Sequence, residues 1–424
     1  MSFETISVLG LGYIGLPTAA MFASKCKKVI GIDVNSTTVD TINSGKIHIV
    51  EPELDIIVQK AVNEGYLKAT LSPEPADAFL IAVPTPFKTN IDPNKTDPEP
   101  DLSYIKLATK AIAPVLRKGN LVILESTSPV GATEQMSEWL ALARSDLTFP
   151  QQKGESSDIR IAHCPERVLP GHVVREMVEN DRVVGGMTPL CSEKAIELYK
   201  TFVEGDCVVT NARTAEMAKL TENSCRDVQI AFANELSIIC DKLEIDVWEL
   251  ISLANRHPRI NILQPGPGVG GHCIAVDPWF IVSRTPEQAK IIKTARLIND
   301  AKPKWVIEKV KLAIADFLQD NLNKMVSDIT IACYGLAFKP DIDDIRESPA
   351  LDITKEILQF HKGRVVAVEP NIPEQSPFLA GINLVTFERA EVLADIHVLL
   401  VEHMQFKTNK PSSGLMVDTK GIWN

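Results

Sequence analysis

The chain begins with a pattern that admits few folds. An apolar segment, residues 5–9, runs directly into Gly-Leu-Gly-Tyr-Ile-Gly at 10–15, and residues 16–25 have helical composition. A second apolar segment, residues 29–33, ends in Asp33, about 20 residues after the glycines. A glycine turn between strand and helix, with an acid ending the next strand, predicts a dinucleotide-binding Rossmann domain.

The same pattern indicates which dinucleotide binds. The pyrophosphate is expected against the amides that open the helix, at Gly10, Gly12 and Gly15. Asp33 can accept hydrogen bonds from the adenosine ribose but would repel a 2′-phosphate, and no arginine follows it directly. We therefore predict NAD rather than NADP as the cofactor.

Two further apolar segments extend the predicted sheet. Residues 78–83 and 121–125 each end in a turn rich in hydroxyl groups and proline, which contain Thr85 and Thr127. Ligands of doubly wound sheets bind beyond the carboxyl ends of the strands. Thr85 and Thr127 are therefore expected to face the nicotinamide half of the cofactor.

Residues 214–243 form one long helical pattern without glycine or proline. Lys219, Asn223 and Arg226 are spaced i, i+4, i+7 and share one face of this helix. One interpretation is a solvated charged stripe. However, many neighbouring side chains are apolar or small, which favours a largely buried helix in which Lys219 has a functional role.

A glycine-rich loop carries the strongest candidate nucleophile. Residues 266–271 include four glycines, Cys273 follows, and Asp277 comes four residues later. Bare backbone lets another chain segment or a polyanionic ligand approach closely. An ordinary buried cysteine is the alternative.

A cysteine in a chain that also binds a hydride acceptor suggests covalent catalysis at the carbonyl oxidation level. An alcohol would be oxidised to an aldehyde, then through a thiohemiacetal and a thioester to an acid. This route needs a cation beside the sulfur and donors for the oxyanions, tasks that suit Lys219 and Asn223. Glu166, in the turn after residues 161–164, suits activation of the hydrolytic water.

The last hundred residues repeat the pattern of the first. Apolar segments at 328–336, 364–371, 394–401 and 414–418 alternate with helical stretches, which predicts a second parallel sheet. No G-x-G-x-x-G occurs there, so this sheet should bind something other than NAD. Lys339, Arg346 and Lys420 lie at or just beyond its strand ends, where a phosphate would bind.

These segments predict an α/β fold in which a central helical domain joins two Rossmann-like, doubly wound parallel-sheet domains. The expected domains are an NAD-binding domain at 1–209, a helical domain with the cysteine loop at 210–322, and a second Rossmann-like domain for a phosphate-bearing ligand at 323–424.

Composition excludes several other classes of protein. The 424 residues have a net charge of −11, which argues against a nucleic-acid partner. The sequence contains no run of 18 apolar residues, so no membrane span is predicted. The eight cysteines form no C-x-x-C pair, and the histidines include no H-E-x-x-H. We expect a reduced, cytoplasmic protein without a structural metal.

The motifs together resemble those of the nucleotide-sugar 6-dehydrogenases over the whole chain and in that family's order. The shared motifs are Gly10-x-Gly12-x-x-Gly15, Pro165-Glu166-Arg167-x-x-Pro170-Gly171, Lys219-x-x-x-Asn223, Gly268-x-Gly270-Gly271-His272-Cys273 and Phe338-Lys339-Pro340. The turn after Glu166 and the histidine before the cysteine are similar to members that oxidise acetamido sugars. The resemblance implies a UDP-N-acetyl sugar substrate, UDP-N-acetyl-D-mannosamine first, for common-antigen polysaccharide.

The resemblance also implies residue roles. Cys273 would be the nucleophile, Lys219 a proton relay and oxyanion partner, and Asp277 a water-orienting acid, with Asn223, Glu166 and Thr127 completing the catalytic set. The implied cofactor contacts are Gly10, Gly12, Tyr13, Ile14, Gly15, Asp33, Thr85, Thr127 and Arg346. The implied substrate contacts are Arg167, Val168, Lys219, Asn223, Arg226, His257, Arg259, Gly270, Phe338, Lys339 and Lys420.

The family is dimeric through its long central helix, and an arginine of the partner subunit completes the substrate site. The resemblance matches Arg259 to this arginine, while His272 either contacts substrate or only packs. Alternatives remain open: the C2 epimer UDP-N-acetylglucosamine as substrate, a two-electron 3-hydroxyacid dehydrogenase, or a non-catalytic NAD sensor. The number of NADH formed per sugar, two, one or none, separates the three classes of activity.

Overall fold

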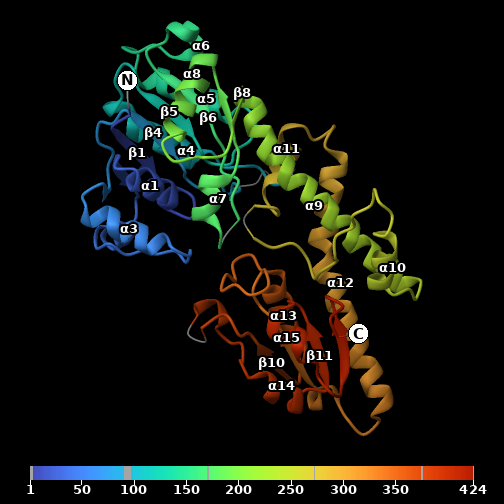
Figure 1. The fold of residues 1–424 in the computed structure, drawn as a ribbon. Coiled ribbons are helices and arrows are strands. Elements are labelled where there is room, and N and C mark those ends of the chain that lie inside the picture. Colours follow the sequence, from blue (N-terminus) through green and yellow to red (C-terminus); the bar gives the residue numbers. More distant parts are fainter. Residues whose placement is uncertain (1–2, 90–96, 170, 272, 374–375, 424) are drawn as a thin grey trace. The chain divides into compact units, whose positions relative to one another are not determined.

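The computed structural model describes residues 3–89, 97–169, 171–271, 273–373 and 376–423 (Figure 1). They form two compact units. The first contains Met1–Glu222 and Trp279–Pro286, and the second contains Asn223–Pro278 and Glu287–Asn424. Among the described residues, no helix has both the length and the apolar character needed to cross a membrane.

The first unit is built on an eight-stranded sheet with the order β3-β2-β1-β4-β5-β6-β7-β8. Its strands are β1 (Thr5–Leu9), β2 (Lys28–Ile32), β3 (Leu67–Thr70), β4 (Ala78–Ile81), β5 (Leu121–Leu124), β6 (Arg160–His163), β7 (Arg182–Gly186) and β8 (Cys207–Asn211). Its helices are α1 (Gly15–Ser24), α2 (Ser36–Asn43), α3 (Leu54–Asn63), α4 (Ser103–Ile112), α5 (Ala132–Ala143), α6 (Pro150–Lys153), α7 (Val173–Glu179) and α8 (Pro189–Tyr199).

The central strands are apolar throughout because both faces of the sheet are covered. Side chains alternate between the faces of a strand. In β4, Ala78 and Leu80 belong to one hydrophobic core, and Phe79 and Ile81 belong to the other. The strand sequences therefore read as unbroken hydrophobic runs.

One part of this sheet departs from the all-parallel prediction. β6 pairs with β7 in the antiparallel direction, with Ala162 opposite Gly186, and β8 then runs parallel to β7. The six strands from β3 to β6 keep the parallel order of a dinucleotide-binding sheet. The reversed pair extends the edge beyond β6 and leaves the β1–β4 crevice unchanged.

The middle of the chain is helical. α9 (Ala212–Lys242) begins in the first unit and continues in the second, and it is followed by α10 (Val247–Ala254), α11 (Asp277–Arg284) and α12 (Lys290–Asp320). α9 contains no glycine or proline, as its sequence indicates. α12 contains Pro303 within its span.

The second unit contains a four-stranded parallel sheet with the order β10-β9-β11-β12. The strands are β9 (Thr330–Tyr334), β10 (Arg364–Val368), β11 (Ile396–Leu399) and β12 (Leu415–Asp418), and the accompanying helices are α13 (Pro349–Phe360), α14 (Phe387–Leu393) and α15 (Met404–Thr408). The α/β class is therefore confirmed, with a mainly parallel first sheet, central helices and a parallel second sheet. The short strand β3 has no counterpart in the sequence prediction.

Candidate active site

The glycine turn after β1 has the geometry expected of a dinucleotide site. Gly10 has a φ of +88°, and a Cβ there would lie 2.5 Å from the carbonyl oxygen of Ala82. A Cβ on Gly15 would lie 1.8 Å from the carbonyl oxygen of Gly10. At Gly12, by contrast, no atom lies within 4 Å of the Cβ position. The open space at Gly12 fits a ligand whose pyrophosphate approaches the backbone.

Two more predicted cofactor residues lie at strand ends of the same unit. Asp33 follows β2, and its carboxylate accepts hydrogen bonds from the backbone N–H of Leu11 at 3.0 Å and of Asn35 at 2.9 Å. These contacts join the acid to the glycine turn. Thr85 Oγ donates to the carbonyl of Thr127 at 2.6 Å, which ties the turns after β4 and β5 together. Tyr13 and Ile14 lie within the glycine turn, Ile14 as the N-cap of α1.

Glu166 takes part in a buried ion pair that its sequence did not predict. Its Oε2 lies 2.8 Å from Arg182 Nη2, and its Oε1 accepts the N–H of Arg167 at 2.8 Å. One carboxylate oxygen is therefore in an ion pair and the other accepts a hydrogen bond. The guanidinium of Arg167 in turn pairs with Glu222 at 2.7 Å. Val168, next along the turn, is partly buried against the core.

A second buried carboxylate shares Arg182. Glu125 accepts hydrogen bonds from Tyr199 at 2.9 Å and Thr18 at 3.3 Å, while Arg182 Nη1 is 3.9 Å away. Burial raises the pKa of Glu125 to about 7, and Arg182 opposes this shift. One guanidinium thus lies near two buried carboxyl groups.

Sequence reasoning missed Arg182, Glu125 and Tyr199. Two of them had a visible signal: Glu125 is an acid directly after an apolar strand, and Arg182 is an arginine opening another. Arg182 is only 3% exposed and its guanidinium stacks on Tyr199, 4.6 Å from the ring centroid. Their partnership is a long-range contact that no local pattern encodes.

α9 is less buried than its sequence predicts. Met217 is 37% exposed, Phe232 50% and Ile239 45%, and Lys219 is half-buried. The apolar positions on α9 are not all covered by the single chain. Among the described residues of the first unit, no carboxylate forms an ion pair with Lys219.

The loop that carries Cys273 is held closely against the second sheet domain. A Cβ on Gly270 would lie 2.5 Å from the carbonyl oxygen of Glu347, and one on Gly271 would lie 3.1 Å from the Phe338 ring. Gly271 N–H also donates to the carbonyl of Glu347 at 3.3 Å. Only glycine fits these two positions. The Cys273 side chain itself is exposed, so the buried-cysteine alternative does not hold.

Cationic groups gather around this loop in the second unit. Burial lowers the pKa of Lys339, the positive charge of Arg226 lowers it further, and Cys273 opposes both effects. Because such electrostatic effects weaken with distance, Arg226 and Cys273 must lie near Lys339. Lys420 Nζ lies 3.5 Å from the Cβ position of Gly266 and 3.3 Å from Glu402 Oε1. Positive charges in such a setting suit a diphosphate.

Asn223 and Asp277 are brought together next to the cysteine. Asn223 Nδ2 donates to Asp277 Oδ2 at 2.5 Å. Asp277 is 4% exposed and begins α11, and its N–H donates to the carbonyl of Cys273 at 2.9 Å. Asp277 therefore connects the cysteine loop to Asn223 on α9.

Three other predicted residues lie elsewhere in the second unit. Arg346 belongs to the second unit, whereas the other predicted cofactor residues belong to the first, and its guanidinium binds Asp344 at 2.7 and 2.9 Å. His257 and Arg259 are exposed in the turn after α10, where Arg259 N–H donates to His257 Nδ1 at 3.3 Å. His272 lies outside the described residues.

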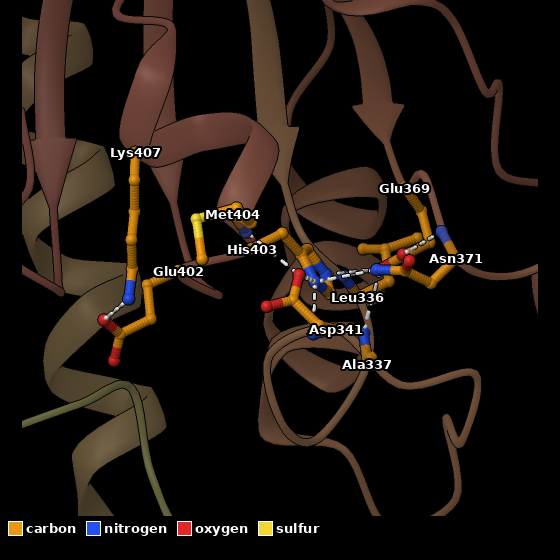
Figure 2. Close-up of polar contacts among 9 residues, drawn as sticks. All are labelled: Leu336, Ala337, Asp341, Glu369, Asn371, Glu402, His403, Met404 and Lys407. Atoms are coloured by element: carbon orange, nitrogen blue, oxygen red, sulfur yellow. Dashed lines mark hydrogen bonds and ion pairs between the residues drawn. The ribbon is translucent and has the colours of Figure 1, made fainter. Parts of the chain in front are cut away.

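Figure 2 shows polar contacts near the carboxyl ends of β9, β10 and β11 in the second sheet. Glu369, after β10, accepts the N–H groups of Leu336 at 2.6 Å and Ala337 at 3.1 Å. Its Oε2 also contacts His403 Nε2 at 3.2 Å, and His403 Nδ1 accepts the N–H of Asp341 at 2.9 Å. Glu369 therefore fixes the turn after β9 much as Asp33 fixes the turn after β1.

Comparisons with known proteins agree with this geometry. Residues 4–203, 213–301 and 332–424 match the NAD binding domain, the central domain and the UDP binding domain of the UDP-glucose/GDP-mannose dehydrogenase family. The UDP-N-acetyl-D-mannosamine dehydrogenase of Yersinia pestis is 64% identical, with all of both chains covered. The NDP-N-acetyl-D-galactosaminuronic acid dehydrogenase of Ralstonia nicotianae is 61% identical, with 100% of this chain and 97% of the relative covered.

Solved structures show the same fold. The UDP-D-ManNAc dehydrogenase of Pyrococcus horikoshii superposes with a TM-score of 0.86 at 37% identity, covering 99% of this chain and 96% of the other. The UDP-N-acetyl-mannosamine dehydrogenase of Staphylococcus aureus gives 0.82 at 39% identity, covering 99% and 95%. The chain is therefore an NAD-dependent oxidoreductase that belongs to the UDP-glucose/GDP-mannose dehydrogenase family.

Proposed function

We propose that the chain oxidises C6 of UDP-N-acetyl-D-mannosamine to the carboxylate of UDP-N-acetyl-D-mannosaminuronic acid, for a cell-surface polysaccharide of the common-antigen type. Relatives of 61–64% identity with this activity in their names support the choice of sugar. A galactosaminuronic acid dehydrogenase at 61% identity makes the sugar's stereochemistry the point to test.

One observation supports the chemistry above all others. The exposed Cys273 sulfur lies on a loop fixed by close glycine contacts, in the neighbourhood of Lys339 and Arg226. A thiol near positive charge forms the nucleophilic thiolate more readily. An enzyme that stopped after one hydride transfer would need no such sulfur.

NAD, held by the glycine turn and Asp33, would supply the hydride acceptor, with one NAD+ needed for each of the two oxidations. Between them, the Cys273 thiolate attacks the aldehyde carbon and forms a thiohemiacetal. Loss of the second hydride from C6 leaves a thioester, and water then releases the carboxylate and restores the thiol. The sum is one alcohol, one water and two NAD+ converted to one carboxylate, two NADH and three protons.

The neighbouring residues have separate roles in this proposal. Lys219 takes the alcohol proton and, with Asn223, stabilises the oxyanions. Asp277 orients the hydrolytic water. Its carboxylate is held in place by a hydrogen bond of 2.5 Å from Asn223. Glu166 is assigned to positioning Arg167, because its Oε1 accepts the N–H of Arg167 and its Oε2 forms an ion pair with Arg182.

The UDP group is assigned to the second unit. Arg226, Lys339 and Lys420 supply positive charge for the diphosphate, with Phe338 beside the loop and His257 and Arg259 as further contacts. The location in the cell belongs to the same proposal: the reaction takes place in the cytoplasm, where NAD and nucleotide sugars are available.

We also propose that the protein is a homodimer through α9. Phe232 and Ile239 are seven residues apart, so these exposed apolar side chains share one face of the helix. The partner's copy of Arg259 would then complete the substrate site. Sedimentation should show a dimer for the wild type and a monomer for the double variant that carries Phe232→Glu and Ile239→Glu. A double variant that is still dimeric would contradict the α9 interface.

The mechanism is tested with stoichiometric enzyme. Cys273→Ala removes the sulfur and little volume, so it should still bind NAD and UDP-sugar. It should form at most about one NADH per active site and no uronic acid. Cys273→Ser should be nearly as impaired, because an alkoxide is much harder to form than a thiolate near neutral pH. Release of uronic acid by Cys273→Ala at the wild-type level would overturn the covalent route.

The substrate is tested with a panel of UDP-sugars and the purified protein. The kcat/KM for UDP-N-acetyl-D-mannosamine should exceed that for UDP-glucose by at least about tenfold, because a pocket built for the acetamido group leaves polar groups unpaired without it. UDP-N-acetylglucosamine and UDP-N-acetylgalactosamine test the epimers at C2 and C4. Preference for UDP-glucose would refute the substrate while leaving the reaction type intact.

A further inference from the structure

A buried asparagine joins the cysteine loop to α9. Asn234, on α9, has no exposed surface, and its Oδ1 accepts the N–H of Gly266 at 2.9 Å. Pro265 and Pro267 flank Gly266 and have no N–H to donate. Gly266 therefore offers the only amide hydrogen of these three buried residues, and Asn234 accepts it.

The orientation of the Asn234 amide is set from the other side. Its Nδ2 donates to Asn299 Oδ1 at 2.9 Å, and Asn299 Nδ2 donates to Asp227 Oδ1 at 2.8 Å. An ionised carboxylate only accepts hydrogen bonds. Asp227 thus forces Asn299 to present its oxygen to Asn234, and Asn234 to present its oxygen to Gly266.

Arg296 completes this network. Its Nη1 lies 2.6 Å from Asp227 Oδ1, and the same guanidinium contacts Asp300. Burial raises the pKa of Asp227, and Arg296 and Asn299 oppose that shift, which favours the ionised form. Asp227, Asn234, Arg296 and Asn299 are each at most 1% exposed. We call these four side chains the α9–α12 network.

We propose that Asn234 is a positioning residue for Cys273, with the α9–α12 network determining how its amide meets the loop. The loop is held at two points, at Gly266 by Asn234 and at Gly271 by the Glu347 carbonyl. Loss of the first point frees the residues that lead to the cysteine. This role rests on the proposed function of Cys273 as nucleophile.

The test compares Asn234→Ala with Asn120→Ala. Asn120 is also a buried asparagine that bridges backbone groups: it donates to the Ala76 carbonyl at 2.8 Å and accepts the Arg117 N–H at 2.7 Å. It belongs to the first unit, whereas the cysteine loop belongs to the second. The two variants lose equivalent hydrogen bonds, so a general loss of stability affects both.

Two readouts do not depend on catalysis. Hydrogen exchange at the Gly266 amide, followed in peptides from residues 263–271, should accelerate by about tenfold or more in Asn234→Ala. Alkylation of Cys273 at pH 7, measured by mass spectrometry relative to the exposed Cys26, should slow by about threefold or more, since the sulfur moves away from nearby cations. The kcat should fall while the KM for NAD stays near wild type. Asn120→Ala should show none of these changes.

An unchanged alkylation ratio in Asn234→Ala would overturn the positioning role, even if exchange at Gly266 accelerates. The same conclusion follows if Asn120→Ala changes alkylation equally. A wild-type protein that makes no uronic acid from any UDP-sugar would refute the proposed function instead; the alkylation and exchange results would still decide whether Asn234 positions the cysteine.

Discussion

Glu166 and Arg182 form a buried ion pair in which 2.8 Å separates Oε2 from Nη2, and the same guanidinium lies 3.9 Å from Glu125. Breaking such a pair is more damaging than its net contribution suggests, because the remaining charge stays buried without a partner. The turn that carries Arg167 therefore depends on a cation from β7.

Arg182→Met should lower the free energy of unfolding by about 3–5 kcal/mol, since it leaves Glu166 buried without its cation. Urea unfolding followed by circular dichroism measures the change. Arg175→Met is the control, because the exposed pair of Arg175 with Glu179 should contribute less than about 0.5 kcal/mol. Equal effects of the two substitutions would contradict the importance of the buried pair.

Gly12→Ala should weaken NAD binding, whereas Gly15→Ala should destabilise the fold. At Gly12 a Cβ meets no atom within 4 Å, so the fold should survive while the KM for NAD rises on the order of tenfold. At Gly15 a Cβ would collide with the Gly10 carbonyl, so the thermal midpoint should fall. Scanning calorimetry and NAD titration separate the two. Unaltered NAD binding by Gly12→Ala would show that the pyrophosphate lies elsewhere.

Asp33 should determine the choice between NAD and NADP. Its carboxylate is fixed by Leu11 and Asn35 at the end of β2, where a 2′-phosphate would be repelled. We expect kcat/KM to favour NAD strongly in the wild type, and Asp33→Asn to narrow that ratio by about tenfold, or ~1.4 kcal/mol. Comparable values for both cofactors in the wild type would exclude this role of Asp33.

His163 should make the protein less stable in acid. Burial lowers the pKa of this histidine from 6.5 to about 3, and neither ring nitrogen has a hydrogen-bond partner among the described residues. Below pH 6.5 the unfolded chain binds a proton that the folded chain excludes. The free energy of unfolding therefore decreases as the pH is lowered from 6.5 to about 3. Between pH 6.5 and 5 this contribution is about 2 kcal/mol.

His163→Leu should remove this dependence. The difference in unfolding free energy between variant and wild type should grow in favour of the variant as pH falls from 6.5 to 5. The exposed His172→Leu serves as the control and should follow the wild type at each pH. Parallel curves for wild type and His163→Leu would mean that His163 is protonated in the folded protein.

The sequence alone determined the fold class and the cofactor. The glycines at 10–15, the acid at Asp33 and the repeated apolar segments are local signals, and each depends on residues close together in the chain. A Rossmann turn must have glycine where Gly10 and Gly15 approach neighbouring backbone, so its residue types are visible without the structure.

Tertiary structure decided what depends on distant partners. The ion pair of Glu166 with Arg182 is one such case, because it depends on strand pairing that reverses direction at β7. α9 looked largely buried, yet a hydrophobic residue does not reveal whether its own chain covers it, and Phe232 remains half exposed. Asn234 has no sequence signal at all, because one amide hydrogen bond to Gly266 depends only on how α9, α12 and the loop pack.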